Sequence, residues 1–204
     1  AFLVLLISVW QWSLSAQLTE SAFRQSLFNV VSILTGTGYA SADYMQWGPF
    51  AVTMFFFIGL IGGCAGSTAC SVKIFRYQLL FASIKAQIRR IHSPHGIFTP
   101  RYQGRPVSED VLNSVMAFFV AFMVAIGVVG VLLAMTGLDF ITSISGAATA
   151  LANVGPGLGN EIGPAGSFAG LNDMAKWILS FAMLVGRLEI LAVFTILSWH
   201  FWRE

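Results

Sequence analysis

The sequence predicts an all-α integral membrane protein, and three observations carry that prediction: its composition, its long apolar runs and an internal repeat. Of the 204 residues, 56% are hydrophobic and 10% are charged, and the mean hydropathy is +0.77. A soluble domain has about 25% charged residues, so this composition excludes a solvated globular domain, a disordered tail and a nucleic-acid-binding arm. The histidines have no carboxylate or cysteine cluster beside them, so we expect neither an enzyme nor an organic cofactor.

Four stretches with few or no charges approach the length of about 20 apolar residues that crosses a bilayer. They are Ala1 to Thr19, Tyr44 to Val72, Val111 to Thr136 and Trp177 to Trp202, the last interrupted by Arg187, Glu189 and His200. Each stretch predicts a helix that spans, or nearly spans, the membrane. The chain opens within an apolar run and has no initiator methionine, so we expect that Ala1 is not the natural start.

Two shorter apolar segments lie between the spanning stretches and predict re-entrant half-helices over 21–34 and 139–152. About a dozen apolar residues make a helix roughly 18 Å long, too short to cross a hydrocarbon core about 30 Å thick. Each half-helix ends in a glycine-bearing run, at 35–39 and 153–157. A shift of 117 positions (155 minus 38) places Thr19 on Thr136, Phe23 on Phe140, Ser26 on Ser143 and Gly38 on Gly155. Because the same shift superimposes the half-helices and the runs, the sequence predicts a twofold repeat.

The predicted repeats are residues 1–90 and 108–204, joined by a basic linker over 91–107. Seven of the eleven basic residues lie between positions 73 and 105, with no acidic residue among them. The positive-inside rule assigns such a segment to the cytoplasm. The carboxyl terminus then also lies in the cytoplasm, and both glycine runs open to the outer side. The lipid bilayer is therefore the first expected partner.

Each glycine run follows the carboxyl end of a half-helix, a position that favours a cation. Glu20 and Asp139 near the amino ends favour half-helices that descend from outside, so their partially negative carboxyl ends point toward the membrane centre. Neither run contains a carboxylate, so the ligands of a cation would be backbone carbonyls, as in potassium-selective filters. The alternative is that each run is only a turn between two helices.

A glycine-rich segment over about 59–71 interrupts the second apolar stretch. Glycine costs up to about 1 kcal/mol relative to alanine in a helix. Four glycines within eight positions, followed by serine and threonine, therefore predict a break at membrane depth. The functional hypothesis is a flexible loop that gates a pore, and the alternative is close helix packing through Gly62 and Gly66. The candidate gate residues in this segment are Gly62, Gly63, Gly66, Ser67 and Thr68.

Arg187 is the most unusual charged residue. It follows Trp177 by ten positions, about 15 Å along a helix, which places it near the membrane midplane. An arginine there costs about 2.5 to 3.5 kcal/mol and needs a partner or a water-filled cavity. The functional interpretation is a fixed positive charge that faces the pore and limits cation flow. The alternative is an interhelical salt bridge, for example with Glu189 of another copy.

Four motifs together resemble the TrkH family of bacterial potassium transporters, in the Trk/Ktr/HKT superfamily. They are Leu34-Thr35-Gly36-Thr37-Gly38-Tyr39, Ala152-Asn153-Val154-Gly155-Pro156-Gly157-Leu158-Gly159, Gly62-Gly63-Cys64-Ala65-Gly66-Ser67-Thr68 and Val185-Gly186-Arg187-Leu188-Glu189. The resemblance covers essentially the whole chain. It implies a pseudo-fourfold pore of four M1-pore helix-M2 units in one polypeptide of more than twice this length, with this chain as the third and fourth units.

The resemblance also implies the function and its residues. Potassium is expected to be the transported ion, bound by the backbone carbonyls of a simple filter in each unit. The filter residues would be Thr37, Gly38, Val154 and Gly155, with Thr35, Gly36, Tyr39, Asn153, Pro156 and Gly157 as neighbours. The intramembrane loop and Arg187 would form the gate. Pro156 stands where the first filter has Tyr39, so the four walls of the filter would not be equivalent.

The resemblance implies partners that the composition does not show. They are the preceding half of the same polypeptide, a second copy in a homodimer and a cytosolic ring of nucleotide-binding regulatory subunits. The expected location is the bacterial inner membrane. The alternative function is an ion-coupled secondary transporter for another solute, because broken helices and repeats also occur in such transporters. Passive flow and symport with protons or sodium both remain open for potassium itself.

Overall fold

The computed structural model describes residues 2–15, 20–64, 66, 71–93, 96 and 98–187. The regular secondary structure within these residues is helical, apart from one short hairpin. The elements in order are α1 (Phe2–Ser15), α2 (Glu20–Leu34), η1 (Tyr44–Trp47), α3 (Gly48–Ile61), α4 (Ile74–His92), β1 (Arg101–Tyr102), β2 (Arg105–Pro106), α5 (Glu109–Ala134), α6 (Phe140–Ala152), η2 (Phe168–Gly170) and α7 (Asp173–Arg187).

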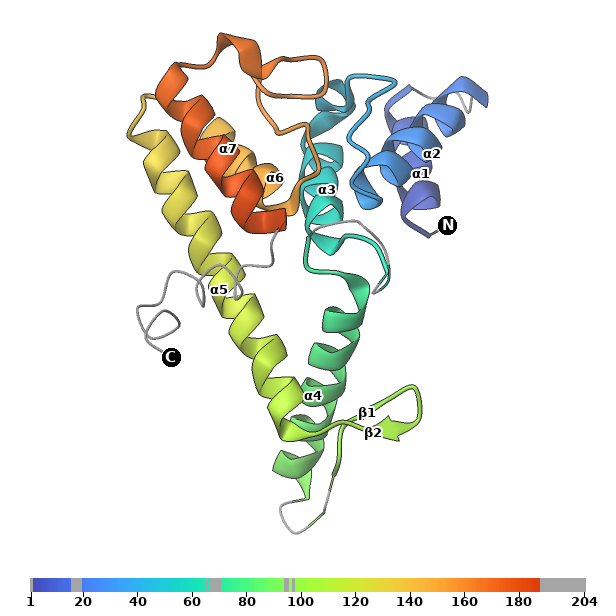
Figure 1. Ribbon diagram of the computed structural model, residues 1–204. Coiled ribbons are helices and arrows are strands. Elements are labelled where there is room, and N and C mark those ends of the chain that lie inside the picture. The colour runs from blue at the N-terminus through green and yellow to red at the C-terminus, as the bar shows by residue number, and fades with distance from the viewer. Residues whose placement is uncertain are drawn as a thin grey trace, which may run out of the picture.

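The helices form two groups that meet at α3 (Figure 1). α1 and α2 pack together on one side of α3, and α6 packs between α5 and α7 on the other side. α4 follows α3 after a break. Near the hairpin of β1 and β2, α4 and α5 converge. The half-helices α2 and α6 therefore lie in different groups, and the chain that follows each of them lies next to α3.

Two described helical segments are long and apolar enough to cross a bilayer: Tyr44–Ile61, with 18 residues, and Glu109–Ala134, with 26 residues. The first corresponds to the predicted stretch Tyr44 to Val72, which is broken at Gly62, as its glycines predicted. α1 has 14 residues within the predicted span Ala1 to Thr19. The last predicted span is described as α7 up to Arg187, and its remainder, with Glu189 and His200, lies outside the described residues.

The amino ends of both half-helices carry the acidic residue that the sequence indicated, Asp139 at α6 and Glu20 at α2. Asp139 precedes α6, and its carboxylate accepts a hydrogen bond from the Thr142 amide at 3.4 Å. Hydrogen bonding from Thr142 lowers the pKa of Asp139 below its usual value. In the first turn of α2, Glu20 and Arg24 form an exposed ion pair at 2.9 Å. Both helices end where predicted, at Leu34 and Ala152.

α6 is the centre of one of two apolar cores because its side chains are small. Every residue of α6 from Thr142 to Ala152 is buried except Ile144, which is half-buried. Small side chains allow α5 and α7 to approach α6 closely from two sides, and Leu133 and Leu179 complete this core. The second core joins α1, α2 and α3, and it also includes Val154 and Leu158 from the chain after α6. The two predicted repeats therefore share a core beside the second glycine run.

The predicted linker contains a hairpin that sequence patterning did not predict. β1 and β2 pair antiparallel, with Arg101 opposite Pro106 and Tyr102 opposite Arg105. The two connecting residues, Gln103 and Gly104, have φ of 50° and 81°. Two consecutive positive φ values are typical of the tight turns that match the twist of a hairpin. Strands of two residues carry no periodicity, so only the Gln-Gly pair could have indicated this turn.

Candidate functional site

The first glycine loop (residues 35–39) begins by reversing the chain at the end of α2. Gly36 has φ 73° and donates its amide hydrogen bond to the Ile33 carbonyl at 3.1 Å. The Thr37 amide reaches back to the Ser32 carbonyl at 2.9 Å. This pair of bonds around a left-handed residue is the Schellman motif, which satisfies the last carbonyls of a helix. The Ser32 hydroxyl then donates to the Tyr39 carbonyl at 2.6 Å, which holds the loop over the helix end.

The second glycine loop (residues 153–157) repeats this geometry at the end of α6. Asn153 is left-handed, with φ 52°, and its amide donates to the Ala150 carbonyl at 3.1 Å. The Val154 amide donates to the Thr149 carbonyl, also at 3.1 Å. The next amide, that of Gly155, donates to the Thr149 hydroxyl at 3.1 Å. The backbone therefore leaves both half-helices in the same way.

The two loops are equivalent residue by residue at the shift of 117 that the sequence indicated. Gly36 corresponds to Asn153 as the left-handed residue, and Gly38 to Gly155, with φ of 80° and 116°. Further along, the amides of Ser41 and Leu158 are also equivalent, and each is held by a side chain of its half-helix. Asn29 accepts from Ser41 at 3.0 Å, and Ser145 accepts from Leu158 at 2.9 Å. The repeat therefore exists in the backbone, although few side chains repeat.

The two loops meet at their glycines. A Cβ atom on Gly38 would overlap the carbonyl oxygen of Val154 and lie 3.2 Å from Cδ of Pro156. A Cβ atom on Gly155 would lie at an ordinary contact distance, 3.6 Å, from the Cα atom of Gly38. Only a residue without a side chain fits at position 38 while the second loop keeps its place. The structure thus brings Gly38 next to Val154 and Gly155, three of the four residues predicted as filter, and the fourth, Thr37, directly precedes Gly38.

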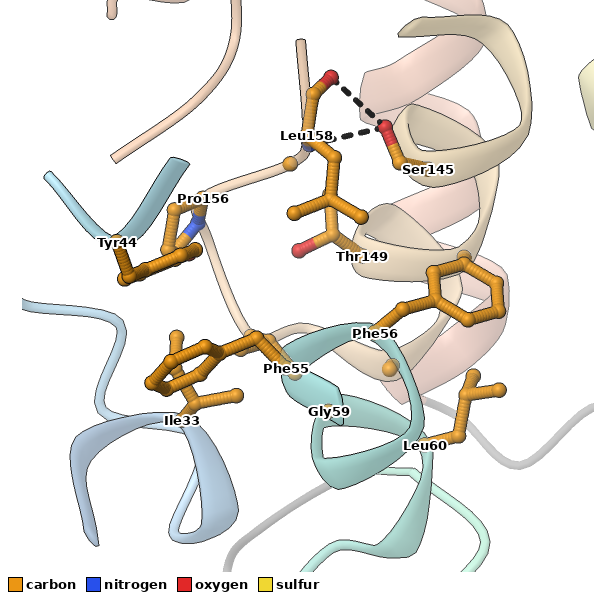
Figure 2. A pocket seen from close by; sticks show the side chains of 14 residues that line it. Ile33, Tyr44, Phe55, Phe56, Gly59, Leu60, Ser145, Thr149, Pro156 and Leu158 are labelled. Carbon is orange, nitrogen blue, oxygen red and sulfur yellow. Dashed lines mark hydrogen bonds between the residues drawn. The ribbon is translucent and has the colours of Figure 1, made fainter. Parts of the chain in front are cut away.

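A small cavity of about 30 Å³ lies behind the second loop, between α3 and α6 (Figure 2). It is lined mainly by apolar groups, among them Phe55 and Leu60, and it has room for about one water molecule. The Ser145 hydroxyl beside it is bonded to both the amide and the carbonyl of Leu158. This cavity is a small gap between side chains that pack beneath the second loop. Its mainly apolar lining does not suit a bare cation.

The described residues contain no group of three or more histidine, cysteine, aspartate or glutamate side chains that could hold a metal ion. The two glycine loops themselves contain no carboxylate side chain.

The break between α3 and α4 is held closed at its base. The returning chain bonds to the carbonyls that α3 leaves open at its end: the Val72 amide donates to Leu60 at 3.3 Å, and the Ser71 hydroxyl donates to Gly59 at 2.9 Å. The Ile74 amide donates to the Gly63 carbonyl at 3.1 Å. Val72 is fully buried. The described residues on either side of the glycine-rich segment are therefore held together by hydrogen bonds, next to the end of α6.

The structure describes part of the predicted gate. Gly62 ends α3 with φ 72°, and Gly63 and Gly66 follow it within the break. Ser67 and Thr68 lie outside the described residues. Arg187 is the last described residue of α7, and its side chain is exposed in this chain.

Three polar residues that sequence reasoning did not single out connect these parts. The Ser71 hydroxyl lies 3.3 Å from the carbonyl of Ala152, the last residue of α6, and so joins the break to the second loop. Asn29 and Ser145 hold the chain after each loop, as described above. All three are buried polar side chains in an apolar chain. A polar residue within an otherwise apolar segment is the feature that could have identified them, because buried polar groups are hydrogen-bonded.

The helix that carries Arg187 is fastened to the second loop. The Asn153 amide side chain donates to the Met183 carbonyl at 3.0 Å, one turn before Arg187. At Gly186 the α7 backbone lies against α6 so closely that a Cβ atom would overlap the Leu151 carbonyl. Asn153, which the sequence suggested only as a neighbour of the filter, therefore also positions α7.

Two substitutions of Asn153 should separate its backbone role from its side-chain role. Asn153→Gly keeps the left-handed conformation and loses the bond to Met183, which should cost about 1 kcal/mol of stability. Asn153→Ala loses the same bond and adds left-handed strain, about 1 to 2 kcal/mol more. Thermal unfolding of the complete protein measures both. A stability of Asn153→Ala equal to or above that of Asn153→Gly would contradict this assignment.

Comparison with known proteins places the chain among cation transporters. A family model described as "TrkH: Cation transport protein" matches residues 3–200. The "Trk system potassium uptake protein TrkI" of Halomonas elongata is 46% identical over 201 residues, which are 98% of this chain and 41% of that protein. The "Trk system potassium uptake protein TrkH" of Vibrio parahaemolyticus is 37% identical over 183 residues, 90% of this chain and 37% of that protein.

A solved structure agrees with the fold. The crystal structure of the potassium transporter TrkH from Vibrio parahaemolyticus superimposes with a TM-score of 0.91 at 34% sequence identity, covering 99% of this chain and 43% of that chain. The chain thus spans about two fifths of the length of the relatives it matches.

Proposed function

Since the chain belongs to the TrkH family of cation transport proteins, a family of transporters and not of enzymes, we propose that the complete protein takes up potassium through a filter built from the two glycine loops and their counterparts. The chain is an all-α membrane protein. The observation that carries the proposal is the contact between two loops of equivalent backbone geometry at Gly38 and Gly155. Carbonyl oxygens close to one axis can replace the hydration shell of potassium.

In this proposal the loops need two more walls, because a ring of carbonyls takes about four loops. The remainder of the longer polypeptide would supply them, consistent with the partial coverage of the relatives. Residues 1–90 and 108–204 would be the third and fourth units. The filters would open outward from the bacterial inner membrane, with residues 73–105 and the carboxyl terminus in the cytoplasm. A homodimer and a cytosolic nucleotide-binding ring would complete the assembly.

The proposal is tested by ion flux in liposomes that contain the complete protein. The expected result is uptake of potassium and of its analogue rubidium well above that of sodium. Uptake that discriminates poorly between potassium and sodium would contradict the filter. Transport of a different solute, driven by an ion gradient, would instead support a secondary transporter. Ion density between Gly38 and Gly155 in a rubidium-containing crystal provides an independent check.

We propose that the break and Arg187 form the gate of this pore. The support is their position: the base of the break bonds to the end of α6, and α7 is fastened to the residue that begins the second loop. Movement of the break or of α7 would then displace the second loop. The exposed guanidinium of Arg187 would place a positive charge in the path of a cation leaving the filter.

Ser71→Ala should raise potassium flux, because it releases the break from both Gly59 and Ala152. A hydrogen bond contributes about 0.5 to 1.5 kcal/mol, so flux should increase about 2- to 10-fold if the open state gains that amount. The matched control is Ser114→Ala, because the Ser114 hydroxyl donates to the Asp110 carbonyl within its own helix. Rubidium influx measures the difference. A folded Ser71→Ala protein with unchanged influx would exclude the coupling.

A further inference from the structure

A basic groove lies at the end of α4 opposite the glycine loops, outside the proposed pore. Its volume is about 460 Å³, within the range of ligand-binding sites, roughly 300 to 1,000 Å³. α4 forms one wall and the chain at β1 forms the other. Three cationic side chains line it, Lys85, Arg89 and Arg101, and among the residues that the structure describes no acidic side chain does.

The sequence of α4 explains why this groove is open and basic. Ala82, Lys85, Ala86 and Arg89 are spaced three, one and three residues apart, so they lie on one face of the helix. The two alanines leave room between the helix and the hairpin, and the two longer side chains border that space. Among the described residues, none of the three cations forms an ion pair. Thr99 contributes a hydroxyl group to the opposite wall.

The groove lies beside the amino end of α5, where the apolar run of that helix begins. Deeper in the protein, Arg76 stacks on Phe118 at 3.9 Å and Tyr77 packs edge-on against Phe119 at 5.3 Å. About two and a half turns further along α4, Ala86 borders both the basic groove and a second groove that is lined by Glu109 and Leu112. The apolar run of α5 starts at Val111. Lys85 and Arg89 therefore lie at the level where hydrocarbon gives way to the polar headgroups.

We propose that this groove binds the phosphate of an anionic phospholipid from the cytoplasmic leaflet. Three cations around one space can neutralise a phosphodiester that bears a net negative charge, with Arg89 and Arg101 able to donate paired hydrogen bonds to its oxygens. Basic pockets between helices on the cytoplasmic side have the chemistry that anionic headgroups require. The exposed side chains of Phe81, one turn before Lys85 in α4, and of Ile84, next to Lys85 in sequence, offer an apolar surface to the acyl chains.

The proposal rests on the membrane placement proposed above and does not depend on potassium transport, so lipid binding is the measurement. The complete protein is placed in phosphatidylcholine nanodiscs that contain a minor fraction of phosphatidylglycerol, and retained lipids are identified by native mass spectrometry. Lys85→Gln, Arg89→Gln and Arg101→Gln should each lower phosphatidylglycerol retention about fivefold. Arg105→Gln is the matched control, because it removes an equal charge from the same hairpin but does not line the groove.

Two further measurements test whether the groove must be empty and whether it binds a lipid or free phosphate. Ala82→Leu fills the groove without changing the charge and should also lower retention. Inorganic phosphate, added at constant ionic strength, should not displace the lipid. Displacement by inorganic phosphate, equal losses in the control and the groove variants, or unchanged retention in all variants would each overturn the proposal. A flux assay on the same samples shows separately whether the transport function is intact.

Discussion

Gly38→Ser should reduce potassium uptake by the complete protein about tenfold or more, because strain of about 1 to 3 kcal/mol at a left-handed position adds to a steric overlap. Gly38 has φ 80°, and a side chain there would overlap the Val154 carbonyl, which belongs to the opposing loop. A backbone carbonyl cannot move aside without displacing the second loop. Both loops would be lost as ligands, and not only the one that carries the substitution.

Gly155→Ser should be milder, and the comparison tests the geometry. Position 155 has φ 116°, which strains a residue with a side chain, but its Cβ atom would meet only ordinary contacts. We expect weaker discrimination between potassium and sodium with uptake retained. Gly170→Ser is the control, since its Cβ atom would meet nothing within 4 Å. Rubidium and sodium influx into liposomes measure all three. Equal effects at positions 38 and 155 would show that the loops do not meet as described.

Gly186→Ala should separate α7 from α6 and destabilise the protein by about 1 to 3 kcal/mol, the usual cost of overpacking. Its Cβ atom would overlap the Leu151 carbonyl and lie 2.9 Å from Nδ2 of Asn153. The helix would have to withdraw, which would break the bond between Asn153 and Met183 and displace Arg187. Potassium flux should change together with the melting temperature. Thermal unfolding and rubidium influx, measured on the same sample, test both effects.

The matched control is Gly127→Ala in α5, where a Cβ atom would meet nothing within 4 Å. It should be neutral, or stabilising by up to about 1 kcal/mol. Arg187→Ala separates the charge from the packing, and it should raise flux. An unaltered melting temperature for Gly186→Ala would disprove the close contact. An inactive but folded Arg187→Ala protein would indicate a structural ion pair in place of a gate.

Much of the fold could be predicted because its determinants are local. The half-helices end at Leu34 and Ala152, as their apolar lengths and glycine runs predicted, and the break begins at Gly62, where glycines gather. Asp139 caps α6, as its position before an apolar run indicated. Helix length, caps and left-handed turns depend on residues within one or two turns, so they can be read from a short window of sequence.

The candidate site could be predicted only in its parts. The shift of 117 positions identified Gly38 and Gly155 as equivalent, but nothing in the pattern indicated that their backbones touch. The same is true of Asn153, whose side chain bonds across 30 positions to Met183. A hydrogen bond of this kind depends on where a second helix packs, and periodicity carries no information about that.

By itself, the sequence determined that this chain belongs in a membrane, where its helices stop and which residues can adopt left-handed conformations. Those properties follow from side-chain polarity and from the steric limits of each residue. Only the tertiary structure decided that the break is fastened beneath the second loop, since Ser71 and Ala152 are 81 positions apart. The small side chains of α6 let α5 and α7 approach it closely. That packing sets which carbonyls face one another.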